Sequence, residues 1–290
     1  MSELLNLMQQ QPSLLYAFVT ILGVLVGSFL NVVIYRLPVM MEREWKRDCA
    51  EFFPDANLKV EAETFNLVVP RSRCPQCDHL IGSAENIPLL SWLWQKGRCK
   101  HCACKISKRY PSIELLTGIL SLCVAYVIPF GWPLLFALLF TWVLIALTFI
   151  DFDTMLLPDQ LTLPLLWFAL LININGTFAS LSDAVLGAAF GYLSLWSIYW
   201  VFKLLTGKEG MGYGDFKLLA ALGAWFGWQA LPLIILLSSC AGAVIGIAAI
   251  VASKDKQSRP MPFGPYLAIA GWVYLVYGDS LTHLYYSLVL

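Results

Sequence analysis

Aspartates stand at the edges of two strongly apolar segments of this chain. The stretch IDFDTMLLPD contains Asp151, Asp153 and Asp159, and the stretch GMGYGDFK contains Asp215. Two carboxylates brought to one site share a proton, because both cannot ionise cheaply at short distance. One of them can then activate a water while the other protonates a carbonyl oxygen. Such a pair hydrolyses a peptide bond without a nucleophilic side chain.

The same aspartates have two other interpretations. Boundary aspartates can be solvated interfacial residues or helix N-caps, and Asp159 and Asp215 both lie near expected helix starts. Carboxylates in a membrane bundle also act as proton or cation relays in transporters. Gly212 and Gly214 would let an extended peptide approach the backbone closely, which suits a protease. Local sequence leaves these alternatives open.

Four cysteines form a second set of candidate functional residues. CPQC (Cys74, Cys77) and CKHC (Cys99, Cys102) are separated by 21 residues and resemble a zinc-ribbon pattern. This spacing turns both thiolates of a pair toward one tetrahedral metal, and four thiolates close its coordination shell, so the zinc would be structural. The alternative is two disulfides or unused thiols. The expected cytoplasmic side is reducing, which favours zinc.

Cys104 makes the fourth ligand ambiguous, because it lies only two residues beyond Cys102. His79 and His101 are further possible substitutes, although surface histidines are the simpler interpretation. Cys123 and Cys240 are most simply buried small apolar residues.

Other enzymatic chemistries lack their residues. The chain has three histidines, no HExxH motif and no GxSxG motif. A zincin-type protease is therefore excluded, and Ser–His hydrolysis is disfavoured. No Walker loop and no GxGxxG after a strand occurs, so the chain carries no nucleotide-binding fingerprint. Carboxylates are left as the reactive groups of its apolar part.

The composition is that of a membrane protein. Of the 290 residues, 59% are hydrophobic and 13% are charged, which is too apolar for an ordinary soluble domain. The net charge of zero gives no indication of a nucleic-acid partner. Of the 19 Lys and Arg residues, 13 lie between Arg36 and Arg109 and none between 110 and 202. The others are Lys203, Lys208, Lys217, Lys254, Lys256 and Arg259.

Eight apolar stretches have the composition of helices that span a lipid bilayer. They are Leu14–Ile34, Ile113–Ile128, Leu134–Ile150, Leu161–Ile174, Ala184–Phe202, Leu218–Trp228, Leu231–Ala252 and Phe263–Tyr277. The first has no basic segment before it and no small-residue cleavage site, so we expect an anchor rather than a removable signal. The sixth is short for a span.

The distribution of basic residues supports eight crossings. With the N-terminus outside, every Lys and Arg falls on the cytoplasmic side, as the positive-inside rule requires. Omitting the short sixth span would move Lys254, Lys256 and Arg259 outside, so we retain it. The expected fold is an all-α polytopic membrane protein with about eight transmembrane helices and a small cytoplasmic zinc-ribbon-like insert.

Three parts follow from this arrangement. We expect an N-terminal anchor span at 1–36, a four-cysteine zinc-binding insert at 37–110, and a seven-span bundle at 111–290 that carries the aspartyl site. We find no internal repeat.

Seven motifs, in order, resemble those of the bacterial type IV prepilin peptidases. They are GSFLNVVIYRLP (27–38), the paired CxxC insert, ENIPLLSW (85–92), RYPSIE (109–114), IDFDTMLLPD (150–159), GMGYGDFKLL (210–219) and PFGPYLA (262–268). A lone GxGD would be weak, whereas seven ordered motifs over nearly the whole chain are specific. The resemblance implies a bifunctional enzyme of the bacterial inner membrane. Such enzymes remove the short basic leader of type IV prepilins and type II secretion pseudopilins after its last glycine, then methylate the new N-terminal residue, typically Phe, with S-adenosyl-L-methionine.

The resemblance also assigns roles by motif position. The catalytic pair would be Asp151 and Asp215. Asp153 and Asp159 match family positions that are not catalytic, and Lys217 would be an auxiliary residue.

The family's cysteine pairs fall on Cys74, Cys77, Cys99 and Cys102, which leaves Cys104 as an addition of this chain. No residue is assigned to methyl transfer. Glu42, Arg43, Lys46 and the insert are candidates by location alone.

The expected placement of the aspartates suits the implied substrates. A basic leader followed by an apolar helix in the bilayer puts the cleavage site at the cytoplasmic interface, where Asp151 and Asp215 are expected. Two competing classes stay open. A proton- or cation-coupled transporter predicts flux without proteolysis, and a noncatalytic pilus or secretion assembly scaffold predicts function after loss of either aspartate.

Overall fold

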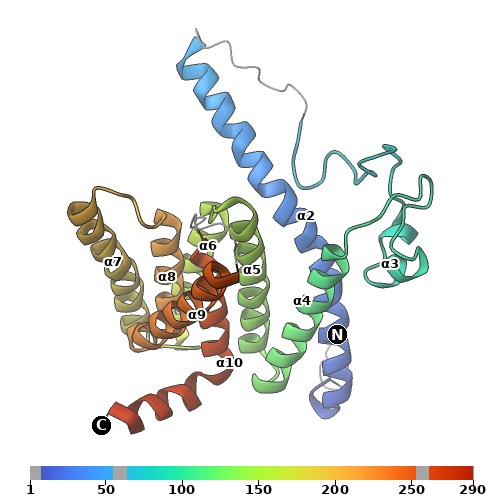
Figure 1. Ribbon diagram of the computed structural model, residues 1–290. Coiled ribbons are helices and arrows are strands. Elements are labelled where there is room, and N and C mark those ends of the chain that lie inside the picture. Colours follow the sequence, from blue (N-terminus) through green and yellow to red (C-terminus); the bar gives the residue numbers. More distant parts are fainter. Residues whose placement is uncertain (1–7, 55–63, 253–260, 290) are drawn as a thin grey trace. The chain divides into compact units, whose positions relative to one another are not determined.

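The computed structural model describes residues 8–54, 64–252 and 261–289, and these are almost entirely helical (Figure 1). The chain divides into two compact units, Met1–Tyr126 and Val127–Leu290. Lys254, Lys256 and Arg259, on which the count of eight crossings partly depends, lie outside the described residues.

The expected spans correspond to helices in the described part of the chain. Five of these helices are long and apolar enough to cross a membrane, namely Pro12–Phe52, Arg109–Val127, Trp132–Thr154, Leu181–Thr206 and Trp228–Ala248. The all-helical, multi-pass character is therefore confirmed. The count of eight crossings stays a prediction.

The first unit is built on helices α2 (Pro12–Phe52) and α4 (Arg109–Val127). Proline is tolerated in the first turn of a helix, which suits the start of α2. The helix then continues through Pro38 to Phe52, well beyond the expected end of the first span at Ile34. The membrane anchor and the start of the predicted insert thus form one helix.

Small residues let α2 and α4 approach closely. A Cβ at Gly27 would lie 2.8 Å from the Glu114 Cα, so only glycine fits there. Next to it, Asn31 Nδ2 donates to the carbonyl oxygen of Tyr110 at 3.2 Å. These contacts bring two of the seven sequence motifs, 27–38 and 109–114, into one packed region.

The described part of the insert between these helices, residues 64–108, contains two short elements, η2 (Ser83–Asn86) and α3 (Leu90–Trp94). Its first part is held on α2 by the buried Arg36, which donates to the carbonyl oxygens of Asn66 at 2.9 Å and Pro70 at 2.6 Å. A buried guanidinium needs such acceptors, because it loses its hydration. These hydrogen bonds tie the loop to the helix.

In its described residues, 127–252 and 261–289, the second unit consists of six helices and two short 3₁₀ turns. They are α5 (Trp132–Thr154), α6 (Asp159–Ile172), η3 (Asn173–Asn175), α7 (Leu181–Thr206), α8 (Tyr213–Phe226), η4 (Trp228–Ala230), α9 (Leu231–Ala252) and α10 (Gly264–Val289).

Helix α8 is the buried helix of this unit. Its residues Phe216, Leu219, Leu222 and Trp225 are fully buried in the main hydrophobic core. Helix α7 packs along it, and the backbones of Gly187 and Gly223 meet so closely that neither position has room for a Cβ. A helix surrounded by other helices needs no lipid-facing length, which explains the shortness of the sixth predicted span.

The end of α8 is fixed by one buried side chain. Asn173 Nδ2 donates to the carbonyl oxygens of Ala224 at 2.9 Å and Trp225 at 3.1 Å. Because α8 ends at Phe226, these carbonyl oxygens have no backbone N–H partner within the helix. Its Oδ1 accepts from the backbone N–H groups of Phe178 and Ala179. Because its side-chain amide both donates and accepts hydrogen bonds, Asn173 anchors α8 to the loop before α7.

Candidate active site

Asp151 and Asp215 lie at the ends of two different helices. Asp151 is in the last turn of α5, which stops at Met155 in the left-handed conformation, with its N–H on the Asp151 carbonyl oxygen at 2.9 Å. Asp215 is in the first turn of α8. Both side chains are buried, at 4% and 6% exposure. Helix ends thus carry both carboxylates into the interior of the second unit.

Backbone N–H groups from two segments hold the two carboxylates. Asp151 accepts the backbone N–H of Gly264, at the start of α10. Asp215 accepts the N–H of Gly212, while its own N–H donates to the Gly212 carbonyl oxygen at 3.2 Å. These two hydrogen bonds between Gly212 and Asp215 fix the first turn of α8. The two aspartates are close enough for the negative charge of Asp151 to act on Asp215.

Each aspartate keeps one oxygen without a partner. Oδ2 of Asp151 and Oδ1 of Asp215 are buried and find no hydrogen bond among the described residues. A buried carboxylate oxygen left in this state is costly, so it marks a place built to hold a proton, a water or a ligand. Two such oxygens near each other provide what acid–base catalysis requires.

Leu157 and two glycines surround the pair. A Cβ at Gly264 would lie 2.6 Å from Asp151 Oδ2 and 2.9 Å from Leu157 Cδ1, and one at Gly214 would lie 2.7 Å from Leu157 Cβ. The two aspartate-bearing regions therefore meet across one half-buried leucine side chain. Sequence reasoning did not identify Gly264 or Leu157 as site residues. The available signal was the PFGP motif, whose glycine directly begins a helix.

The other two acids of the first stretch lie outside this arrangement. Asp153 is exposed, because two residues along a helix turn a side chain to the opposite face from Asp151. Asp159 begins α6 and pairs with Lys217 at 2.7 Å. This placement agrees with their expected noncatalytic role.

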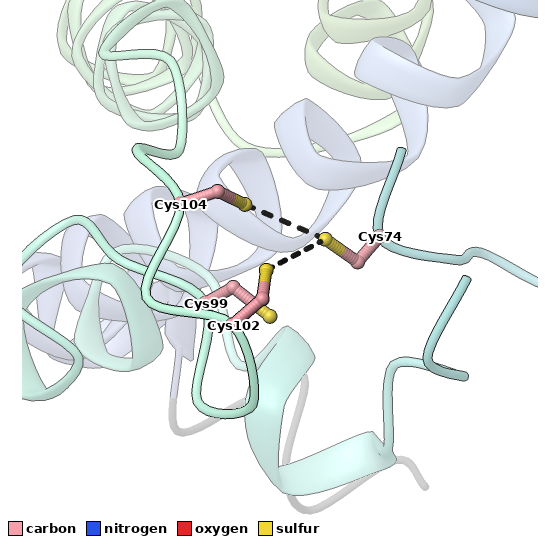
Figure 2. Close-up of side chains that lie close together, drawn as sticks. All are labelled: Cys74, Cys99, Cys102 and Cys104. Atoms are coloured by element: carbon pink, nitrogen blue, oxygen red, sulfur yellow. Dashed lines mark hydrogen bonds between the residues drawn. The ribbon is translucent and has the colours of Figure 1, made fainter. Parts of the chain in front are cut away.

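The cysteines of the insert gather into one cluster. The sulfur atoms of Cys74, Cys99, Cys102 and Cys104 lie within 4.8 Å of one another (Figure 2). Cys77 is at the edge of this group, with its sulfur 4.0 Å from that of Cys99. The group within 4.8 Å therefore contains three of the four predicted ligands, with Cys104 in place of Cys77.

The two cysteine turns repeat the same backbone geometry. Cys74 N–H donates to the His79 carbonyl at 2.9 Å, and Cys99 N–H to the Cys104 carbonyl at 2.8 Å. The residue after each second cysteine, Asp78 or Ala103, has φ of 55°. The turns form a short structural repeat that the sequence search missed, because little besides the cysteines is shared.

Backbone donors single out particular thiols within the repeat. N–H groups of Gln76 and Cys77 lower the pKa of Cys74 to about 6. The N–H of Cys104 likewise lowers the pKa of Cys102. The thiolate is the form that binds metals, so these donors prepare the cluster for a cation. Several thiols converging on one point are the donor set of a structural zinc site.

The candidates for methyl transfer on α2 are occupied by other contacts. Lys46 Nζ pairs with Glu42 at 2.6 Å on the helix surface, and the guanidinium of Arg43 lies 4.3 Å from the centre of the Phe65 ring. These residues stabilise α2 and the loop beside it.

A multi-pass helical protein with two buried aspartates at adjoining helix ends has the features of a membrane-bound aspartic peptidase. The chain belongs to the type IV leader peptidase family, which residues 138–247 match. Residues 21–128 match the bacterial peptidase A24 N-terminal domain. The two matches cover the two halves of the chain.

Relatives of known activity extend over the whole chain. It is 60% identical to a prepilin leader peptidase/N-methyltransferase of Aeromonas salmonicida, over 100% of both chains. It is 54% identical to one of Pseudomonas aeruginosa, over 97% of both. No solved structure matches the chain. The chain is thus a multi-pass membrane enzyme of this family, with leader peptidase and N-methyltransferase activity.

Proposed function

We propose that the chain removes the leaders of type IV prepilins and type II secretion pseudopilins at the cytoplasmic face of the bacterial inner membrane, with Asp151 and Asp215 as its catalytic pair. One observation carries the aspartyl assignment. Each of these residues is buried and holds one oxygen without a partner, at adjoining ends of α5 and α8. The names of its relatives supply prepilins as the substrate class, and the resemblance of the sequence motifs adds the pseudopilins.

Peptide hydrolysis needs one aspartate in each protonation state. The ionised carboxylate takes a proton from water, whose oxygen attacks the carbonyl carbon of the leader's last glycine. The protonated carboxyl gives its proton to the carbonyl oxygen. Collapse of the tetrahedral intermediate releases the leader, and the new amine takes up a proton. Gly264 keeps Asp151 in place through its backbone N–H.

The membrane arrangement is part of the proposal. We infer that all eight main helices cross the bilayer, that 1–36 is the anchor, that 37–110 is a cytoplasmic insert, and that 111–290 forms the catalytic bundle. The insert holds a structural zinc through Cys74, Cys77, Cys99 and Cys102. Support for the last set comes from the repeated turns, in which Cys77 and Cys102 occupy equivalent places. S-adenosyl-L-methionine supplies the methyl group for the second activity.

The test is cleavage of a purified prepilin in lipid by Asp151→Asn, Asp215→Asn and the double variant, followed by mass measurement. Asn has nearly the shape of Asp but cannot hold the charge or pass the proton. Each single change is expected to abolish leader loss, and the double variant to be no worse, since the residues act as one unit. Asp153→Asn is the control and keeps cleavage. Cleavage by Asp215→Asn would reject the aspartyl mechanism. Absence of cleavage by the wild-type protein would instead favour a transporter or a scaffold.

The proposed sidedness has its own test. Cysteines introduced at Gly131 and Ser180, in a background without native thiols, are expected to react with membrane-impermeant reagents from outside the cell. A cysteine at Lys208 is expected to stay unlabelled. The reverse pattern would put the aspartates on the wrong face of the membrane.

A further inference from the structure

A cavity of about 380 Å³ lies beside the second cysteine turn, within the first unit. Its walls come from η2, from the end of α3 and from the turn itself, through Glu85, Trp94, Arg98, Cys99 and Lys100. This volume is in the range of sites that hold small organic molecules, roughly 300–1,000 Å³. The cavity belongs to neither the aspartate pair nor the sulfur cluster, although Cys99 borders both the cluster and the cavity.

The wall of this cavity presents an aromatic face and charges of both signs. Trp94 is 74% exposed, so a face of its ring is accessible to a ligand. The Glu85 carboxylate is largely covered and is held by the N–H of Gly82 at 3.3 Å, which lowers its pKa and keeps it ionised. Lys100 Nζ is 3.8 Å from Glu85, beyond hydrogen-bond distance. His79 Nε2 lies closer, at 3.5 Å from Oε2 of the same carboxylate, so two basic side chains stand beside Glu85.

A matching ligand would have a flat ring, a positive group and a carboxylate. We propose that this cavity binds S-adenosyl-L-methionine, the methyl donor of the enzyme's second activity. Trp94 offers a π face for the purine and the sulfonium. Glu85 pairs with the ammonium group, and Arg98 or Lys100 with the carboxylate. The assignment rests on the methyltransferase activity of the family and is independent of the roles of Asp151 and Asp215.

Local structure explains how these residues are presented. Trp92 Nε1 donates to the carbonyl oxygen of Ile106 at 3.4 Å, which closes the segment around the second cysteine turn. Gly97 has φ of +66°, and a Cβ there would lie 2.8 Å from the Trp92 ring. The chain can therefore reverse tightly between Trp94 and Arg98 only with glycine at this position. That reversal brings the aromatic residue and the two cations to one cavity.

Binding of the methyl donor can be measured without turnover. We expect equilibrium dialysis of the purified full-length protein with labelled S-adenosyl-L-methionine to show saturable binding, with affinity reduced at least about tenfold in Trp94→Ala. Glu85→Gln keeps an acceptor for Gly82 but removes the charge, and is expected to weaken binding about as strongly. Leu93→Ala is the matched control. Leu93 is another exposed apolar residue of α3, outside the cavity wall, and its removal should leave the affinity within about twofold of wild type.

Photocrosslinking locates the ligand directly. Irradiation with labelled S-adenosyl-L-methionine is expected to label the tryptic peptide 74–96, which contains Glu85 and Trp94, and S-adenosylhomocysteine should compete. Zinc content and resistance to proteolysis, measured for each variant, show that the insert is folded. Label confined to other peptides, or unchanged affinity in both Trp94→Ala and Glu85→Gln, would overturn the assignment. A wild-type protein that neither binds the donor nor methylates a cleaved pilin would overturn the activity along with it.

Discussion

Lys217 Nζ lies 2.7 Å from Oδ1 and 2.8 Å from Oδ2 of Asp159, joining the first turn of α6 to the first turn of α8. Lys217 follows Asp215 by two residues, and Asp159 follows the loop that carries Leu157. The pair therefore braces both sides of the aspartate site without touching it.

Removal of the Asp159–Lys217 ion pair is expected to have a modest effect on leader cleavage. Asp159→Asn and Lys217→Met are each expected to lower kcat/KM for leader cleavage by less than about tenfold, because a partly exposed pair contributes about 1 kcal/mol or less. The double variant should be no worse than the more damaged single one, which a double-mutant cycle on prepilin cleavage will measure. Complete loss of cleavage in Asp159→Asn would instead place Asp159 among the catalytic residues.

Two glycines near the aspartates are predicted to differ sharply in tolerance. A Cβ at Gly264 would lie 2.6 Å from Asp151 Oδ2, so Gly264→Ala must displace the carboxylate and should reduce cleavage by about 100-fold or more. A Cβ at Gly212 would meet Asp215 Oδ2 at 3.8 Å, an ordinary contact, so Gly212→Ala should stay within about threefold of wild type. Steady-state cleavage assays on both variants test this. Equal damage by the two changes would show that the site geometry is described wrongly.

Leu157 is predicted to help select glycine at the end of the leader. Its side chain occupies the space between Gly214 and Gly264, where an extended substrate would pass beside the aspartates. Leu157→Ala should therefore narrow the preference for a leader ending in Gly over one ending in Ala by about tenfold, since one methyl group in a tight pocket is worth about that much. The ratio of kcat/KM for the two prepilins measures it. Leu156→Ala is the control, because Leu156 is the equally half-buried neighbour, and it should leave this ratio unchanged. An unchanged ratio in Leu157→Ala would show that Leu157 does not determine specificity.

The metal prediction separates two possible ligand sets. The purified protein is expected to hold about one zinc per chain, measured by mass spectrometry of the metal, and Cys77→Ser to lose it. Cys104→Ser should keep the metal, because Cys104 contributes its backbone N–H to Cys102, which serine preserves. Loss of zinc in Cys104→Ser together with retention in Cys77→Ser would assign the site to Cys74, Cys99, Cys102 and Cys104.

The sequence predicted the two acids that the structure buries near each other, but not the residues that surround them. Asp151 and Asp215 lie at the boundaries of apolar segments, and such a boundary can be recognised from neighbouring residues alone. The contact of Gly264 with Asp151 joins two segments far apart in the chain, so no local pattern contains it. The extension of α2 to Phe52 was missed for a different reason. The expected span ended with its apolar residues at Ile34, whereas the helix continues through Pro38 into the charged residues that follow.

For the cysteines, too, the sequence predicted the local features but not the tertiary contacts. Spacing identified the two pairs, because a CxxC turn is a short-range unit. The position of the Cys104 sulfur, 3.5 Å from that of Cys74, depends on how the two turns face each other. That relationship is tertiary, and spacing alone cannot rank Cys77 against Cys104.

The contact between Gly187 and Gly223 restricts how relatives of this chain can diverge. Facing helices usually accommodate a larger side chain on one of them by a smaller one on the other. Here both residues are already the smallest available, so neither can compensate for growth of its partner. Any larger residue must wedge α7 from α8 and shift the helix that carries Asp215. Among homologous sequences, loss of either glycine should therefore accompany loss of an aspartate, which gives a simple way to recognise members that have given up hydrolysis.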